Sequence, residues 1–150
     1  MSLEADLQEL VDYRALLELK YRYCWCVDAD DIEGFANVFT EDAVLTARQF
    51  GDDEPYLRRE GHEELRELIR ERQETLNRSL GQHRPYNPLI TIDGDEAEGQ
   101  WYMTAVTKEG DGTFEFEFGE YHEQYRRTDG DWKIARCAVE YLEMAPELAE

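Results

Sequence analysis

The 150-residue sequence has few lysines, few histidines and no long apolar segment. Its lysines are Lys20, Lys108 and Lys133, and it has 3 histidines. No run of about 18 apolar residues is present, and no signal-peptide pattern begins the chain. We therefore expect a cytoplasmic protein without a membrane span. A chain of this length predicts one domain, 1–150, with a sizeable core.

Positive charge is scarce as a whole, because 16 basic residues stand against 36 acidic ones and the net charge is −20. A field of that sign repels nucleic acid and anionic membranes, so neither is expected as a partner. Acid spread along the whole chain, together with so little lysine, resembles the cytoplasmic proteins of salt-accumulating microbes, which need salt to screen their self-repulsion. An ordinary acidic protein is the alternative.

Few residues are available for metal or nucleophile chemistry. Cys24 and Cys26 lie two apart on a predicted helix and point to different sides, so they cannot share an unstrained disulfide. Together with Cys137 they are interpreted as reduced, apolar residues, and a C-x-C metal pair stays the alternative. His62 begins HEELR, which lacks the second histidine of the zinc motif H-E-x-x-H, and it is expected to be solvated. Phosphate-binding loops and the G-x-S-x-G elbow are absent as well.

Hydrophobic periodicity predicts three helices and five strands. The helices are expected at 4–28, 31–39 and 62–77, and the strands at 43–50, 83–92, 96–108, 113–128 and 132–143. Turns at 93–95 and 128–132 join the last strands as hairpins, and 51–60 is expected to be a loop. This order predicts an α+β fold in which a curved antiparallel sheet carries three helices on one face. Such a cone has a pocket at its mouth.

The segment between the first two helices carries several acids with different expected roles. Asp28 opposes the helix dipole at its position, and its spacing places it on one face with Tyr21 and Cys24, interpreted as the buried face. Asp30 is expected to cap the next helix, with Glu33 as its capping-box partner. Asp28 alone is therefore a candidate for a buried role.

The long strand over 113–128 changes parity along its length. Three alternating phenylalanines share one face, whereas Tyr121 falls on the other. A bulge near Gly119 would restore a single apolar face and bend the sheet. On the following strand Arg136 is expected to pair with Glu123, and an anion-binding role in the pocket is the alternative.

Three stretches resemble the polyketide-cyclase-like (SnoaL-like) group of the nuclear-transport-factor-2-like superfamily. They are RYCWCVDADDIEGFANVFTEDAVL, QHRPYNPLITIDGDEAEGQWY and GEYHEQYRRTDGDWKIAR, and the likeness covers about 8–143. The group includes scytalone dehydratase, bile-acid 7α-dehydratase, ketosteroid isomerase and limonene-epoxide hydrolase. The resemblance implies a cone-shaped α+β barrel, no cofactor, no metal, a hydrophobic small-molecule ligand and a homodimer formed through the sheet.

The resemblance also implies catalytic residues. Tyr23 matches a tyrosine that supplies a hydrogen bond, Asp28 an aspartate beside a catalytic histidine, and His83 that histidine. A carboxylate that holds one ring nitrogen fixes the imidazole tautomer, so the other nitrogen can move a proton near neutral pH. The implied reaction is dehydration or isomerisation of a hydrophobic cyclic carbonyl compound.

Further residues match the ligand-binding part of the group or depart from it. Tyr121 falls on a polar pocket position and the strand containing Trp101 resembles one of the bile-acid enzyme, so Trp101, Phe118 and Tyr121 are expected to line the pocket. Other functional positions of these enzymes carry unrelated residues here, at Ala47, Ala105, Thr107 and Tyr141. These departures disfavour steroid isomerisation and keep open a non-catalytic domain that only binds a ligand or dimerises.

Overall fold

The computed structural model of the protein describes residues 2–75, 80–108 and 110–142. Three helices, α1 (Leu3–Asp28), α2 (Ile32–Asn37) and α3 (Gly61–Thr75), are combined with six strands. The strands are β1 (Phe39–Gln49), β2 (Leu57–Glu60), β3 (Leu80–Asp93), β4 (Glu96–Lys108), β5 (Phe114–Thr128) and β6 (Asp131–Leu142).

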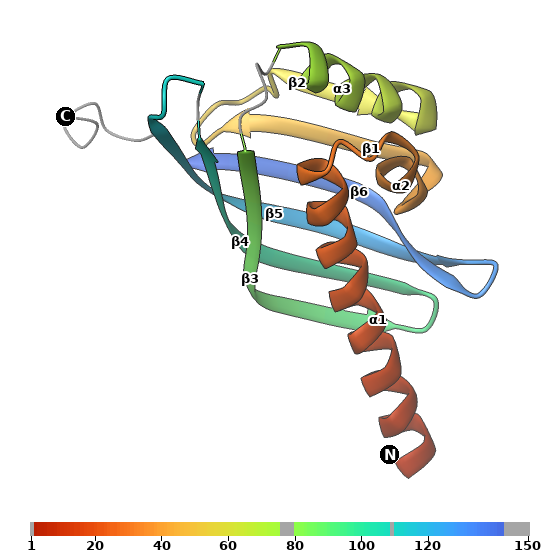
Figure 1. Ribbon diagram of the computed structural model, residues 1–150. Coiled ribbons are helices and arrows are strands. Elements are labelled where there is room, and N and C mark those ends of the chain that lie inside the picture. The colour runs from red at the N-terminus through yellow and green to blue at the C-terminus, as the bar shows by residue number, and fades with distance from the viewer. Residues whose placement is uncertain (1, 76–79, 109, 143–150) are drawn as a thin grey trace.

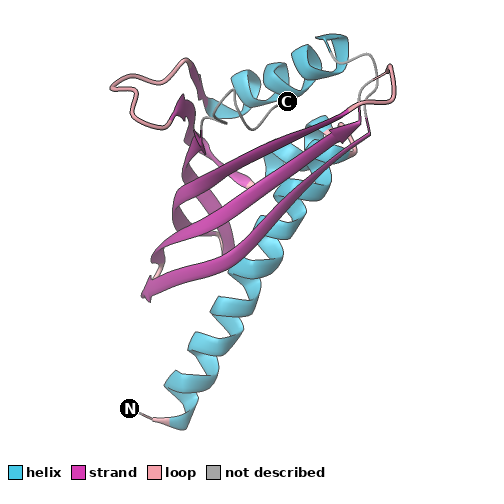
Figure 2. Cartoon of the chain, turned by 90° about the vertical axis from the view of Figure 1, so that its left-hand side faces the viewer, coloured by secondary structure: helices cyan, strands magenta, loops and turns pink. Residues whose placement is uncertain are grey.

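The six strands form one sheet in the order β2-β1-β6-β5-β4-β3. The sheet is strongly curved and does not close, and the helices lie on its concave side (Figures 1 and 2). The predicted α+β cone is thereby confirmed. The sheet is mixed rather than wholly antiparallel, because β1 runs parallel to β6. The chain between β1 and β6 contains β2, α3 and the strands β3 to β5, so the connection is long enough for a parallel return.

Two boundaries near the start of the sheet were predicted wrongly. The expected loop 51–60 contains β2, which pairs with β1 through Val44 and Glu60. The cap of α2 is Asp31, whose carboxylate accepts from the Gly34 backbone N–H at 2.9 Å. Asp30 instead has a left-handed backbone with φ 53°, a conformation that aspartate tolerates in turns.

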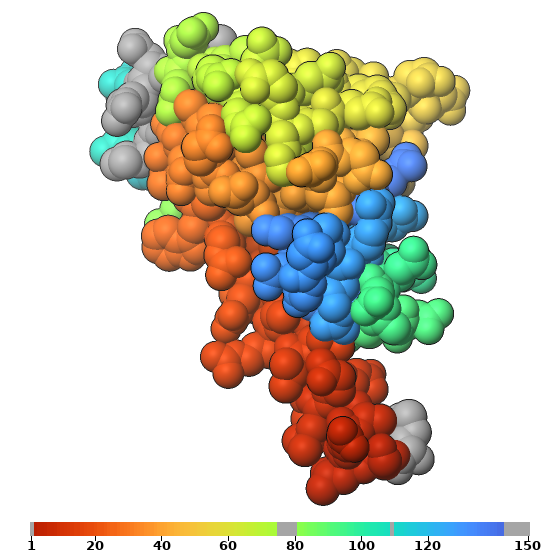
Figure 3. Space-filling view, turned by 90° about the vertical axis from the view of Figure 1, so that its right-hand side faces the viewer, coloured from red at the N-terminus to blue at the C-terminus, as the bar shows by residue number. Residues whose placement is uncertain are grey.

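Helix α1 buries a stripe that lies one position away from the predicted one. Its buried apolar residues include Leu16, Leu19, Tyr23 and Val27, whose spacing follows one helical face. Tyr21 is 44 % exposed, so the face it shares with Asp28 is the edge of the buried stripe rather than its centre. The N-terminal end of α1, exposed as far as Val11, projects beyond the sheet (Figure 3).

Strand β5 has no bulge at Gly119, contrary to the prediction. Its pairing continues through Gly119 to Met103 of β4 and to Tyr141 of β6. A Cβ at Gly119 would lie 2.5 Å from the Glu140 carbonyl oxygen, so the backbones approach too closely for a side chain. The three phenylalanines therefore stay on the outer face, where they are 41–59 % exposed.

A buried ion pair lies at the centre of the concave side. Lys20 Nζ is 3.2 Å from Glu123 Oε2, and both side chains are 0 % exposed. The ammonium also lies 3.7 Å and 3.2 Å from the ring centroids of Tyr23 and Tyr121, close enough for cation–π attraction. Charge and aromatic rings together fill this part of the cone.

The expected Glu123–Arg136 pair does not form. Glu123 points to the concave side, where the Tyr125 hydroxyl donates to it at 3.0 Å and the Trp101 indole N–H donates to Tyr125 at 2.9 Å. Arg136 is opposite Gln124 in the register, so it lies on the convex face. Alternation of side chains along paired strands separates the two residues.

Candidate active site

The last residue of α1 and the edge strand β3 bring a carboxylate and an imidazole together. Asp28 Oδ1 is 2.6 Å from His83 Nδ1. The side chains of His83 and Asp28 are 12 % and 19 % exposed. Fifty-five residues separate the two in the chain, so only the packing of α1 against β3 can create this contact.

Asp28 also binds the backbone of β3, which accounts for its position at the end of a helix. The His83 backbone N–H donates to Oδ2 at 2.9 Å and approaches Oδ1 at 3.2 Å. These charge-assisted bonds offset the unfavourable interaction of a carboxylate with the helix C-terminus. The Asp28 carboxylate therefore holds both the backbone and the ring of one residue.

The arrangement fixes how the His83 ring can act. An N–H at Nδ1 donates to the carboxylate, which leaves the lone pair on Nε2. Nε2 has no hydrogen-bond partner among the described residues. The ring is therefore held in position through Nδ1, while Nε2 is available to accept a proton, as a general base requires.

His83 and Asp28 line a cavity of about 470 Å³ between α1 and β3. Aromatic rings of Tyr21 and Trp25 and the ring of Pro85 supply apolar walls. The remaining lining residues are Cys24, Ala29, Gly81, Gln82 and Arg84. The volume and the apolar walls with few polar groups suit a small hydrophobic molecule.

Cys24 is the lining residue with a potential nucleophile, but its environment keeps the thiol protonated. Burial raises the pKa of Cys24 to about 12. A thiolate is the reactive form, so Cys24 acts as an apolar wall at neutral pH. Cys26 and Cys137 are free and buried too, in agreement with the reduced state predicted for all three cysteines.

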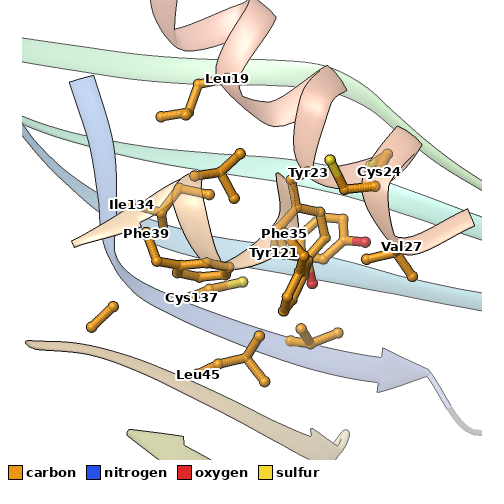
Figure 4. Packing of buried hydrophobic residues seen from close by; sticks show 14 of the residues in the cluster. Leu19, Tyr23, Cys24, Val27, Phe35, Phe39, Leu45, Tyr121, Ile134 and Cys137 are labelled. Carbon is orange, nitrogen blue, oxygen red and sulfur yellow. The ribbon is translucent and has the colours of Figure 1, made fainter. Parts of the chain in front are cut away.

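The other residues expected at the site lie elsewhere. Tyr23 and Tyr121 belong to the core, 6 % and 1 % exposed, with ring centroids 5.7 Å apart (Figure 4). Burial raises the pKa of both phenols far above the usual range. Trp101 is also in the core, and its ring packs in a T-shaped arrangement with Tyr21, with ring centroids 6.2 Å apart. Phe118 is on the convex face, away from the cavity.

Sequence reasoning missed Tyr21 and Trp25 as cavity residues. Trp25 is 76 % exposed and lies one turn before Asp28, so the (i, i+3) spacing was a usable signal. His62 was expected to be solvated, yet it is half-buried with Nε2 2.9 Å from the Phe39 carbonyl oxygen. That contact joins α3 to β1 and explains why His62 is held inside.

Comparison with known proteins places the fold in the class of nuclear-transport-factor-2-like or cystatin-like folds. A protein of that description from Novosphingobium aromaticivorans has a TM-score of 0.82 at 22 % identity, with 97 % of this chain and 91 % of that chain covered. The SnoaL-like domain family matches residues 8–138. The chain therefore belongs to the SnoaL-like domain family.

Two further solved structures with this fold carry names that include an activity. A candidate scytalone dehydratase from Novosphingobium aromaticivorans has a TM-score of 0.78 at 22 % identity, with 91 % of this chain and 87 % of that chain covered. A hexachlorocyclohexane dehydrochlorinase (LinA) type 2 has a TM-score of 0.78 at 19 % identity, with 91 % and 88 % covered. At these identities the likeness establishes the fold.

Two classes of feature are missing from the described part of the chain. No helix over 2–75, 80–108 and 110–142 is both long and apolar enough to cross a membrane. Within the same ranges no three His, Cys, Asp or Glu side chains are grouped so that they could hold a metal ion.

Proposed function

We propose that this protein is a cofactor-independent lyase, a dehydratase, or an isomerase that acts on a hydrophobic cyclic carbonyl compound. The observation that supports the proposal is the 2.6 Å contact between Asp28 and His83 at an apolar cavity. His83 is the proposed catalytic residue, and Asp28 is the residue that positions it.

In the proposed reaction His83 Nε2 removes a proton from the carbon next to the carbonyl. The C–H electron pair forms the enolate, and the Asp28 carboxylate stabilises the imidazolium that results. In a dehydration the enolate then expels hydroxide from the β-carbon, which takes the proton from Nε2 and leaves as water. In an isomerisation the same proton returns to a different carbon of the substrate. Tyr23 is buried in the core, so the proposal gives it no contact with the substrate.

A screen of cyclic β-hydroxy ketones and unsaturated ketones tests this function, with ultraviolet absorbance reporting formation or movement of the conjugated double bond. His83→Gln should lower turnover about 100- to 10,000-fold, the usual contribution of a general base, while the thermal midpoint changes little. His122→Gln is the matched control, since His122 is exposed and bonded to Glu120. Equal turnover by both variants would refute the role of His83.

The alternative is a non-catalytic domain of the same fold that binds a small ligand. The filled centre of the cone favours it, because Lys20, Tyr23 and Tyr121 occupy the interior with their own side chains. The two functions differ in one measurement. A ligand that binds to the wild type and to His83→Ala, and is converted by neither, would establish the alternative.

The proposed assembly is a homodimer through the outer face of the sheet. Aromatic side chains gather there, with Tyr102, Phe114, Phe116 and Phe118 each at least 41 % exposed. An apolar area of this kind on a sheet marks an association surface. Light scattering should give twice the mass of 17.7 kDa, and Phe116→Glu should give monomers. A wild-type protein that stays monomeric would disprove the dimer.

A further inference from the structure

Arginines on this acidic protein typically bind carboxylates, and Arg72 on α3 is an exception. Its Nε is buried and has no hydrogen-bond partner among the residues that the structure describes. The nearest carboxylate oxygen, Asp30 Oδ1, is 3.8 Å away, too far for a hydrogen bond. On the same helix, Arg66 and Arg70 bind Glu33 and Glu63 at 3.0 Å.

The Arg72 side chain is only 23 % exposed, so its guanidinium has lost part of its hydration, and the distant Asp30 carboxylate does not replace the hydrogen bond missing at Nε. Such a group costs stability unless a ligand supplies the missing acceptor. Carboxylates match the fork of N–H groups on arginine and bind it through two parallel hydrogen bonds. The unused bonding capacity of Arg72 is therefore specific for an anionic oxygen group.

The guanidinium lies beside the proposed active site. A Cβ built on Gly81 would lie 3.4 Å from Arg72 Nη2 and 3.8 Å from Thr107 Oγ1, so Arg72 covers β3 at Gly81. Gly81 lines the cavity together with His83. Residues two apart share a face of a strand and lie about 7 Å from each other. Arg72 is not itself a lining residue of the cavity, so a molecule bound at the His83 ring would reach it by extending along β3 past Gly81.

From this geometry we infer that Arg72 binds a carboxylate of the small molecule that occupies the His83 cavity, and that the ligands of this site are aromatic or cyclic acids. The inference rests on the cavity of the proposed function but not on its catalysis. The chain carries a net charge of −20, and such a field repels anions. Selection of an acid over a neutral analogue therefore requires a local cation such as Arg72.

The test compares 2-naphthoate with 2-naphthamide, two molecules of the same shape that differ in charge. Calorimetric titration of the wild type should give tighter binding of naphthoate. Arg72→Leu should weaken naphthoate roughly 10- to 100-fold, the range expected for charge-assisted hydrogen bonds, and should leave naphthamide unchanged, so that the preference reverses. Arg70→Leu removes the same charge from an exposed position on the same helix and should preserve the preference.

A spectroscopic measurement keeps the inference testable if Arg72→Leu fails to fold. In ¹⁵N-labelled protein the Arg72 Nε–H resonance should shift downfield on addition of naphthoate and stay in place with naphthamide. Arg72→Lys keeps the charge without the fork and should recover part of the naphthoate affinity.

Three outcomes would overturn the inference: no preference for naphthoate in the wild type, an equal loss of both ligands in Arg72→Leu, or an unmoved Nε–H resonance. The proposed catalysis can fail separately. If naphthoate binds through Arg72 but the protein converts no ketone, this inference stands and the proposed catalysis is wrong. A protein that converts ketones but binds naphthoate no more tightly than naphthamide would overturn this inference and leave the proposed catalysis intact.

Discussion

Two of the ion pairs that tie α1 to the sheet differ in what surrounds them. Lys20 and Glu123 are 0 % exposed, and aromatic rings and a tyrosine hydroxyl take up their remaining interactions. His83 and Asp28 are 12 % and 19 % exposed, and His83 Nε2, at the cavity, has no partner in the described part of the chain. The first pair is closed and can contribute only to the fold. In the second pair, Asp28 holds His83 Nδ1 while Nε2 stays accessible from the cavity, as proton transfer to or from a substrate requires.

The largest effect is expected at the open pair. Asp28→Asn should reduce turnover about 100- to 10,000-fold, because an amide neither fixes the tautomer nor stabilises the imidazolium. The free energy of unfolding should fall by only about 1 kcal/mol, since an amide oxygen still accepts from the backbone N–H. Initial rates and urea denaturation measure the two quantities. The ¹⁵N shifts of the His83 ring should report loss of the single tautomer even before a substrate is known.

At the closed pair the loss should fall on stability. Lys20→Met leaves the Glu123 carboxylate buried and uncompensated, which costs about 3–5 kcal/mol. The double variant Lys20→Met with Glu123→Leu should recover most of that loss, because an apolar replacement of a buried pair is often neutral. Urea denaturation of both variants checks the prediction. If Lys20→Met alone were as stable as the wild type, the prediction would be wrong and the buried pair would not contribute more to stability than the open one.

A third carboxylate, Asp12, sharpens the comparison by its dependence on pH. Hydrogen bonds from Arg127, then from Trp132 and Gln8, lower the pKa of Asp12. A carboxylate whose pKa is lowered in the folded state stabilises the fold fully at pH values above its unfolded-state pKa of about 4. That contribution is lost as the pH falls through the lowered pKa. Asp12→Asn should therefore cost about 1–3 kcal/mol at pH 7.

The same variant should cost little at pH 2 to 3, as followed by denaturant unfolding across the range. Asp95→Asn is the matched control. Asp95 also binds Arg127 at 2.9 Å, but it is 77 % exposed, and exposed pairs contribute about 0–1 kcal/mol. Equal losses for both variants at pH 7 would show that burial does not distinguish them.

The smallest effect concerns the charge of the whole surface. If the excess of acid is an adaptation to salt, molar KCl should raise the thermal midpoint by about 2–4 °C, which corresponds to about 1 kcal/mol in a chain of this size. The rise should disappear near pH 4.4, the isoelectric point of the sequence. A thermal midpoint independent of KCl at pH 7 would identify an ordinary acidic protein.

Periodicity predicted most of the fold because the hairpins and helices are local features. The turns at Asp93–Glu96 and Thr128–Asp131 lie where DGD and TDGDW indicated. The parallel pairing of β1 with β6 joins residues about ninety positions apart, and no local pattern encodes it. The missing bulge at Gly119 has the same origin, because the constraint is the carbonyl of Glu140 on a neighbouring strand.

The candidate site was predictable only in part. The pairing of Asp28 with His83 came from family resemblance, since hydrophobic spacing alone cannot join α1 to β3. The closed pair had a signal that was overlooked: Lys20 has the spacing of Leu16 and Tyr23 on α1, and Glu123 alternates with buried tyrosines on β5. A charge at a core position of each element indicates a buried partner. The missing hydrogen bond at Arg72 Nε depends on atomic distances, and no sequence pattern indicates it.

The hydrogen bond from the His83 backbone to Asp28 also affects how readily the protein aggregates at high concentration. Strand β3 is an outer strand of the sheet, and its unpaired N–H groups could receive a strand from another chain. The Asp28 carboxylate occupies one of these donors and places negative charge where an invading strand would have to lie. Asp28, which orients the imidazole, thus also hinders the edge strand β3 from pairing with a strand of another chain.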